Sequence, residues 1–386
     1  MTHLKDFFLL DPNVIFLNHG SFGATPKPVF ESYQRWQLEL ERQPVEFLGR
    51  RHNGLMRASR AALAEFVGTS ENNVVYVTNV TVGLNIVARS LELGPGDEVL
   101  STDHEYGALD RTWRFLATEK GFANIKSQIS LPLPAPEEFV EHFWKSVTPH
   151  TRVIFISQIS SPTAIIFPVA EICARARREG IITVIDGAHV PGQIPLALDL
   201  LGADFWSGNL HKWLMSPKGS GFLYARPEVQ HLLNPLVVSW GYEAEIPGPS
   251  HFIDYHEWMG TRDPAAFLAV PDAIQFQKEH AWDVVQEDCF TLAEYAQGII
   301  CGLTNLPALH KPGAQTFRQV VAMSLPVNTD VIALKTRLYD EYHIEVPVHV
   351  WNGHKLIRVS VQGYNTRDDI DALYAALKAL LPQTIC

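Results

Sequence analysis

Two residues near the middle of the chain combine a nitrogen nucleophile with an acid. Lys212 is followed directly by the apolar residues 213–215, and Asp186 stands 26 residues earlier, at the end of the apolar run 182–185. An apolar setting lowers the pKa of a lysine, and the resulting neutral amine can attack a carbonyl carbon to form a Schiff base. Each residue alone has an ordinary alternative, because most lysines are solvated surface charges and a strand-end aspartate is often a helix cap. The pair therefore indicates Schiff-base chemistry only in the company of further elements that bring the two residues together.

The elements around this pair predict an α/β domain with a mostly parallel sheet. Short β-branched runs alternate with helical patterns, which is typical of a parallel sheet covered by helices. Strands are expected at residues 74–78, 98–101, 152–157, 182–185 and 219–225, and helices at 81–91 and 168–179. In open sheets of this kind, functional groups gather at the carboxyl ends of the strands, which is where Asp186 stands.

The sequence changes in character after about residue 235, where Pro235 and Pro247 mark an irregular stretch. Beyond it the pattern predicts a smaller α+β region whose last strand spans residues 356–361. A helix that opens with the capping-box pair Thr366 and Asp369 follows this strand. We therefore expect three parts, an N-terminal segment (1–15) that packs on the small domain, a large domain (16–250) and a small C-terminal domain (251–386).

The overall composition narrows the classes of partner. Of 386 residues, 31 are lysine or arginine and 42 are aspartate or glutamate, which gives a net charge of −11. An acidic surface repels phosphate backbones and anionic lipid heads, so we expect neither a nucleic acid nor a membrane partner. No apolar run reaches the roughly 20 residues that span a bilayer, and the first residues lack the pattern of a signal peptide. The four cysteines show no CxxC spacing and no set of metal ligands stands out, which favours a cytoplasmic protein without a metal site.

Eight motifs connect these residues to a known family. They occupy residues 16–23, 78–85, 103–108, 160–163, 186–189, 211–214, 260–264 and 358–360, in family order over nearly the whole chain. They resemble the motifs of the class V aminotransferase family, whose members are fold type I enzymes that use pyridoxal 5′-phosphate (PLP), and most closely those of isopenicillin N epimerase-like proteins. The resemblance implies a PLP-dependent transferase-like fold, an amino-acid substrate and a homodimer with active sites at the subunit interface.

The resemblance also implies a role for each matching residue at the cofactor. Lys212 would form the Schiff base and later move the α-proton, Asp186 would pair with the pyridine nitrogen, and Tyr106 would stack on the ring. The other cofactor contacts would come from the backbone amides of Val80 and Thr81, from Asn209 and His211 on the phosphate side, from His189 and Ser161 near the ring oxygen, and from Thr261, which would reach the phosphate of the neighbouring subunit. Tyr106 and His189 each have an alternative as ordinary core residues.

On the substrate side, the resemblance assigns Arg358 to the α-carboxylate, which a guanidinium binds with two parallel hydrogen bonds. An arginine inside an otherwise apolar strand needs an anionic partner, although a structural ion pair would also provide one. Asn18, His19 and Arg262 are further substrate-side candidates, and Arg262 is equally compatible with a second anion site or a surface charge.

The sequence leaves several reactions open. Residues 346–355, which precede Arg358, hold no cysteine, and this disfavours the persulfide chemistry of desulfurases. We expect an epimerase or racemase that inverts the α-carbon of an amino acid, with Lys212 on one face and Tyr106 or His19 as the second acid. A β-eliminating C–S lyase, an aminotransferase and a non-catalytic PLP-binding protein are the alternatives.

Overall fold

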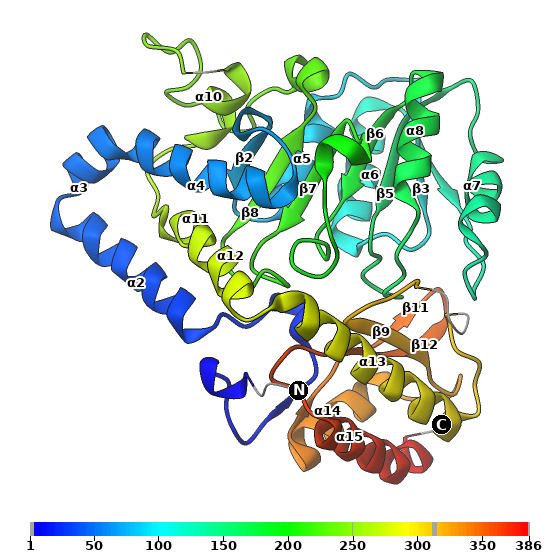
Figure 1. Cartoon of the computed structure of the whole chain (residues 1–386). Coiled ribbons are helices and arrows are strands. Elements are labelled where there is room, and N and C mark those ends of the chain that lie inside the picture. The colour runs from blue at the N-terminus through cyan, green and yellow to red at the C-terminus, as the bar shows by residue number, and fades with distance from the viewer. Residues whose placement is uncertain (1–3, 249, 311–314, 385–386) are drawn as a thin grey trace.

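The central element of the molecule is a sheet of seven strands. The computed structural model describes residues 4–248, 250–310 and 315–384, and within them the strands lie in the order β2-β8-β7-β6-β5-β3-β4 (Figure 1). They are β2 (Val74–Val77), β3 (Glu98–Thr102), β4 (Ala123–Ser127), β5 (Thr151–Ser157), β6 (Ile182–Asp186), β7 (Phe205–Asn209) and β8 (Gly221–Ala225). All neighbouring pairs from β7 to β4 are parallel, and β8 runs antiparallel to both β2 and β7. The expected α/β fold with a mostly parallel sheet is therefore confirmed.

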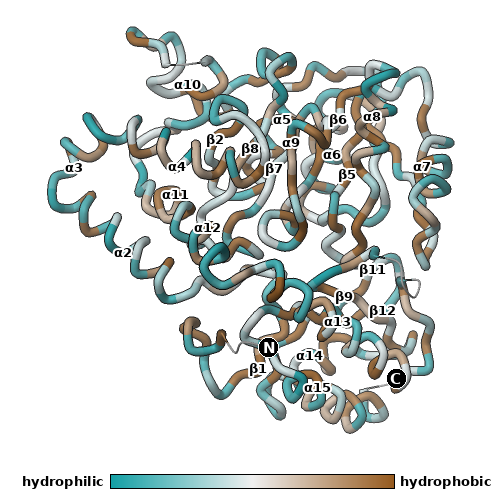
Figure 2. Tube along the Cα trace, in the orientation of Figure 1, coloured by the Kyte–Doolittle hydropathy of each residue, from teal (hydrophilic) through white to brown (hydrophobic). Residues whose placement is uncertain are grey.

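Both faces of this sheet are buried under helices. In β5, Val153 and Phe155 belong to the core on one face, whereas Ile154 and Ile156 belong to the core on the other. The covering helices are α5 (Val80–Ser90) and α6 (Gly107–Lys120) on the first face and α4 (His52–Val67), α7 (Pro136–Trp144) and α8 (Val169–Glu179) on the second. Because side chains on both faces need apolar neighbours, β2, β5, β6 and β8 are predominantly apolar, and Figure 2 shows hydrophobic segments gathered among the strands.

The C-terminal part is built on a second sheet of three antiparallel strands in the order β11-β12-β9. Its elements are β9 (Val320–Ser324), β11 (Val348–Trp351), β12 (His354–Ser360), α13 (Trp282–Thr304), α14 (Val331–Tyr342) and α15 (Arg367–Leu380). The predicted capping box of Thr366 and Asp369 opens α15, and the apolar face of this helix is buried as expected. Although α13 is long, no helix in the described ranges is both long and apolar enough to cross a membrane.

The beginning of the chain lies on this C-terminal part. β1 (Ile15–Phe16) pairs in parallel with β10 (Ile344–Glu345), and the Leu4 amide donates a hydrogen bond of 3.2 Å to the Gly363 carbonyl. Figure 1 shows the N-terminal end close to α14 and α15. The chain then leaves the small sheet and crosses to the large one, so residues 17–23 run between the two parts.

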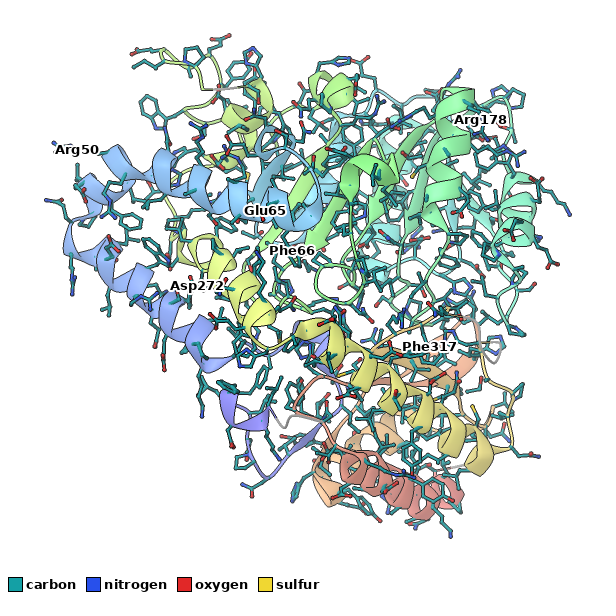
Figure 3. All side chains as sticks on the ribbon, viewed as in Figure 1. Arg50, Glu65, Phe66, Arg178, Asp272 and Phe317 are labelled. Carbon is teal, nitrogen blue, oxygen red and sulfur yellow. The ribbon has the colours of Figure 1, made fainter. Side chains whose placement is uncertain are left out.

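Two helices after the irregular stretch pack on the large sheet's side of the molecule. α11 (Ala265–Leu268) and α12 (Val270–Glu279) contact α2 (Lys27–Arg42) and α4. The Ser32 hydroxyl of α2 donates to the Asp272 carboxylate of α12 at 2.7 Å, and Figure 3 labels Asp272 where these helices approach. α11 and α12 therefore pack on the large domain, although both helices follow residue 250, where the domain boundary was predicted.

Candidate active site

A cavity of about 480 Å³ lies at the carboxyl edge of the seven-stranded sheet. Its walls include residues that end or directly follow β2, β3, β5, β6 and β7, which end on the same edge. Nine residues expected at the cofactor line it, namely Val80, Thr81, Tyr106, Ser161, Asp186, His189, Asn209, His211 and Lys212. The fold therefore brings together side chains from five separate stretches of the sequence.

Lys212 and Asp186 share this low-dielectric site. Asp186 ends β6 and is buried, and its Oδ1 accepts a hydrogen bond of 2.8 Å from the Ala188 amide. Burial raises the pKa of Asp186 to about 6, against the lowering effects of that hydrogen bond and of Lys212. Lys212 is accessible only in part, where it borders the cavity, and burial lowers its pKa to about 7, helped by Arg358 and opposed by Asp186. Much of the Lys212 amine is therefore neutral near pH 7, which is the form that attacks a carbonyl carbon.

The first turn of α5 forms an anion-binding corner of the cavity. Asn79 caps the helix by accepting a 3.0 Å hydrogen bond from the Val82 amide, and the Val80 amide donates to Asn209 Oδ1 at 3.1 Å. Among the described residues, the Thr81 amide has no protein acceptor. Because a helix N-terminus carries partial positive charge and free N–H groups, this corner suits a phosphate.

Tyr106 stands directly before α6 and lines the cavity with 46 % of its surface exposed. Its phenol lies close enough to Arg358 to raise the pKa of that guanidinium, against a larger lowering by burial. The location is compatible with the stacking role that the family resemblance implies. That role stays a prediction, because it concerns a contact with the cofactor ring.

Arg358 is a buried cation that makes no salt bridge with any described residue. It belongs to β12, where its Nη1 donates to the carbonyl and hydroxyl oxygens of Ser161 and its Nη2 donates to the Ser21 hydroxyl at 3.2 Å. Its Nε has no hydrogen-bond partner in the described part of the chain. Burial lowers the pKa of Arg358 to about 10. A buried charge without a counter-ion is costly, so the site is complete only when an anion binds there.

Two histidines flank the lysine, and both are neutral near pH 7. His189 Nε2 lies 3.1 Å from Lys212 Nζ, and His211 Nδ1 lies 3.1 Å from the Ser220 carbonyl oxygen. Burial, together with the charge of Lys212, lowers the pKa of His189 well below its usual value and that of His211 to about 4. Each histidine therefore acts as a neutral hydrogen-bonding group at the cavity wall.

Five expected site residues are not part of the cavity lining, namely Asn18, His19, Thr261, Arg262 and Arg358, although Arg358 donates hydrogen bonds to the lining residues Ser21 and Ser161. His19 is fully buried, with Nδ1 2.8 Å from the Tyr364 hydroxyl and Nε2 3.0 Å from the Lys212 carbonyl oxygen, and burial lowers its pKa to about 3. His19 therefore supports the backbone under Lys212 and does not reach the substrate side. Asn18 also lies outside the cavity lining, and its side-chain amide donates a hydrogen bond of 2.8 Å to the Glu345 carboxylate.

Thr261 and Arg262 lie outside the cavity of their own chain. The Arg262 guanidinium donates to the Glu257 carbonyl at 2.7 Å and lies 4.7 Å from the ring centroid of Phe267. Within one chain, Arg262 is thus a partly enclosed cation away from the cavity, and its expected place beside the substrate stays a prediction.

Ser21 was not among the expected site residues, yet it lines the cavity and accepts a hydrogen bond from Arg358. Ser21 donates to Asn18 Oδ1 at 2.5 Å, so Asn18 acts on the site through Ser21. The turn that carries Ser21 requires Gly23, whose φ is +71°, because a Cβ there would lie 1.9 Å from the His211 carbonyl oxygen. The sequence signal was this glycine-bounded turn inside the motif at 16–23.

A second missed residue is Glu105, a carboxyl buried behind the cavity. Its Oε1 accepts from the Thr102 hydroxyl at 2.5 Å, and its Oε2 accepts from the Ser157 amide and hydroxyl at 2.9 and 2.6 Å. Burial raises the pKa of Glu105 to about 7, and the like charge of Asp186 acts in the same direction. Glu105 thus ties the ends of β3 and β5 together next to β6. Its neighbours in the sequence do not distinguish it from a surface acid.

These features define the class of the protein. A partly neutral lysine near a carboxyl, a helix N-terminus with a free amide, and a buried arginine without a counter-ion are features that suit PLP and an amino acid. The class V aminotransferase family matches residues 17–373, and the chain belongs to this family. It is a PLP-dependent enzyme.

Individual relatives carry names of more than one activity. The chain is 34 % identical to isopenicillin N epimerase of Amycolatopsis lactamdurans, over 96 % of each chain. It is 26 % identical to the probable chloroplastic L-cysteine desulfhydrase of Arabidopsis thaliana, over 98 % of this chain and 85 % of that protein. The fold is shared with a solved C-DES mutant in which glycine is covalently linked to the PLP cofactor, with a TM-score of 0.82, 23 % identity and coverage of 97 % and 98 % of the two chains.

We predict that borohydride reduction of the PLP-loaded protein fixes the cofactor on Lys212. The pKa of about 7 makes the amine of Lys212 available near neutral pH. Peptide mass spectrometry checks the position of the adduct. Lys218 offers a control six residues further along the chain, because it is exposed and does not line the cavity. Lys218→Ala should keep the adduct and Lys212→Ala should lose it, whereas an adduct on Lys218 would disprove the assignment.

Proposed function

We propose that the protein is an epimerase or racemase that inverts the α-carbon of an amino acid. The observation that carries the proposal is the position of two proton-transfer groups around one anion site. Lys212 and Tyr106 line the same cavity, and so do Ser21 and Ser161, which accept hydrogen bonds from Arg358. An amino acid whose carboxylate is bound at Arg358 would lie between a base and a second acid.

Each residue then has a distinct task in the inversion. Bound PLP supplies the electron sink that makes the α-proton acidic. Lys212 removes this proton from one side of the α-carbon, and Tyr106 donates a proton from the other side. Asp186 keeps a proton on the pyridine nitrogen, since a carboxylate stabilises that positive charge. Tyr106 is preferred to His19 as the second acid because both ring nitrogens of His19 have partners away from the cavity.

Arg358 and its two serine partners orient the substrate. The guanidinium is held from two sides, by Ser21 on the N-terminal turn and by Ser161 after β5. Fixing the carboxylate reduces the rotation of the α-carbon, so that its hydrogen can lie next to Lys212. The unpartnered Nε of Arg358 supports this role, because a bound carboxylate would satisfy it.

A β-eliminating C–S lyase is the principal alternative, because elimination also begins with loss of the α-proton. The similarity to proteins named L-cysteine desulfhydrase supports it. A cysteine-based persulfide mechanism is disfavoured, since burial raises the pKa of Cys173 and Cys289 to about 12 and neither they nor Cys301 lines the cavity. Transamination would differ from both, because it leaves the amino group on the cofactor and releases a keto acid that keeps its β-substituent.

The proposal extends to a homodimer whose active sites lie near the interface. The segment 236–246 exposes large apolar side chains, with 67 % of Val238, 86 % of Trp240 and 91 % of Ile246 accessible. A contiguous exposed apolar segment of this kind is typical of an interaction surface. Thr261 lies outside the cavity of its own chain, as a residue that reaches a partner's phosphate would.

The first test is incubation of the PLP-loaded protein with a panel of L- and D-amino acids in D₂O. We expect deuterium at the α-carbon, because Lys212 exchanges its protons with solvent. We also expect samples that start from the L and from the D enantiomer of one amino acid to reach the same mixture of both enantiomers. Nuclear magnetic resonance measures the deuterium and chiral chromatography measures the inversion. Stoichiometric pyruvate and ammonia from cysteine or cystine without inversion would establish the lyase instead, whereas a keto acid that keeps its β-substituent, released without ammonia, would establish transamination.

The second test is Tyr106→Phe, which keeps the ring and removes the hydroxyl. We expect the variant to retain PLP and to exchange the α-proton of one enantiomer, because Lys212 is unchanged. Inversion should fall by roughly 10²–10⁴-fold, the usual effect of losing a positioned acid. The ratio of inversion to exchange is the decisive measurement, and an unchanged ratio would remove Tyr106 from the mechanism.

The third test is Arg358→Gln. We expect amino-acid binding to weaken by about 2–5 kcal/mol, because the substrate carboxylate loses its charged partner. Spectroscopic titration of the bound cofactor with an amino acid measures this change. Arg152→Gln is a suitable control. Arg152 lies near the start of β5, whereas the cavity borders the end of this strand at Ser157, and Arg152 forms an ion pair with Asp97. Equal affinity in Arg358→Gln and in this control would contradict the assignment.

A further inference from the structure

Three side chains form a line of contacts that ends at the amine of Lys212. The Trp213 indole Nε1–H donates a hydrogen bond of 3.2 Å to His189 Nδ1, and His189 Nε2 lies 3.1 Å from Lys212 Nζ. Trp213 and His189 are buried, and His189 and Lys212 border the cavity. The indole thus contacts the side of the imidazole that is turned away from the lysine.

The chemistry of the indole determines which nitrogen of His189 carries hydrogen. An indole has one donor and no acceptor, so His189 Nδ1 must be unprotonated to receive its hydrogen bond. A charged imidazolium is excluded, because both of its nitrogens carry hydrogen. Burial, with the charges of Lys212, Arg358 and His211, also lowers the pKa of His189 well below its usual value. Neutral His189 therefore has its hydrogen on Nε2, beside the lysine.

We propose that Trp213 is a positioning residue that holds His189 in the Nε2-protonated tautomer, so that His189 donates a hydrogen bond at the nitrogen of Lys212. A neutral lysine nitrogen accepts this bond through its lone pair, whereas an ammonium carries only hydrogens and cannot accept it. The arrangement favours the reactive amine over the ammonium. It rests on the proposed function only in taking Lys212 as the point of cofactor attachment, and it holds whichever reaction follows.

The other groups around Lys212 do not depend on Trp213 for their charge. They are Asp186 at the end of β6, Arg358 on β12, His211 next to the lysine, and His19, whose Nε2 lies 3.0 Å from the Lys212 carbonyl oxygen. Asp186 favours the ammonium and Arg358 disfavours it, while both histidines are neutral near pH 7. Replacing the indole by another aromatic ring leaves these groups in place. A change in the protonation of Lys212 then reports on His189.

The direct test is nuclear magnetic resonance of the cofactor-free protein labelled with [¹⁵N]histidine. The two nitrogens of a neutral imidazole have separate ¹⁵N shifts, according to which one carries hydrogen. We expect His189, identified by its absence in His189→Gln, to show a protonated Nε2 and an unprotonated Nδ1 across neutral pH. A protonated Nδ1 in the unmodified protein would overturn the proposal, and this measurement requires no variant of Trp213 and no substrate.

The second test is the pH dependence of PLP capture, followed by visible absorbance, in Trp213→Phe. Without the indole, His189 can protonate Nδ1 and accept from the lysine ammonium, so we expect the midpoint of capture to move to higher pH. Capture at pH 7 should fall several-fold and recover in alkaline solution. Trp144→Phe is the control, because Trp144 is buried on α7 and donates its indole hydrogen to Glu179. Identical midpoints in Trp213→Phe and this control, with an unchanged His189 tautomer, would refute the role of Trp213.

Discussion

The site depends on one electrostatic constraint, which is the withdrawal of Lys212 from bulk water between a carboxyl and a guanidinium. Burial disfavours the ammonium, Arg358 repels it and Asp186 partly stabilises it, so the amine is held close to half-protonated at neutral pH. Moving a lysine pKa from 10.5 to about 7 corresponds to several kcal/mol of differential interaction, since each unit is about 1.4 kcal/mol. The fold must supply that energy, and it does so by enclosing the lysine in a cavity whose walls come from the carboxyl edge of the large sheet and from the N-terminal turn that carries Ser21.

The two charges around Lys212 come from different parts of the molecule, and the N-terminal segment connects these parts. Asp186 ends β6 of the large sheet, whereas Arg358 lies on β12 of the small sheet. The turn at residues 18–23 joins them, because Ser21 accepts a hydrogen bond from Arg358 and Gly23 closes against the His211 carbonyl. A shift of the small sheet relative to the large one would therefore change the protonation of Lys212 as well as the substrate site. The pairing of β1 with β10 attaches the segment before this turn to the C-terminal part of the molecule.

Local patterns in the sequence were sufficient for the architecture and for most of the residues that the fold brings together in the cavity. Apolar β-branched runs predicted the strands, and the motifs predicted nine residues that line one cavity. The pattern failed where function depends on a contact distant in sequence. Nothing beside His19 in the sequence indicates that Tyr364 and the Lys212 backbone occupy its nitrogens, and nothing beside Glu105 indicates that Ser157 encloses it. Burial and partner identity are properties of the fold, so residue type alone could not separate these buried groups from ligand-binding ones.

The features that the relatives share cannot decide the reaction, because inversion, elimination and transamination all require a lysine, an acid at the pyridine nitrogen and a carboxylate site. What separates them is the fate of the α-carbon after its proton has left. Inversion requires a proton donor on the face opposite Lys212, and we propose Tyr106 for this role, because its phenol borders the cavity and, unlike the hydroxyl groups of Ser21 and Ser161, accepts no hydrogen bond from Arg358 in the described part of the chain. Elimination requires instead a substrate with a leaving group, which is a property of the ligand. The choice between epimerase and lyase therefore depends on whether the Tyr106 hydroxyl delivers its proton before the substrate loses a β-substituent.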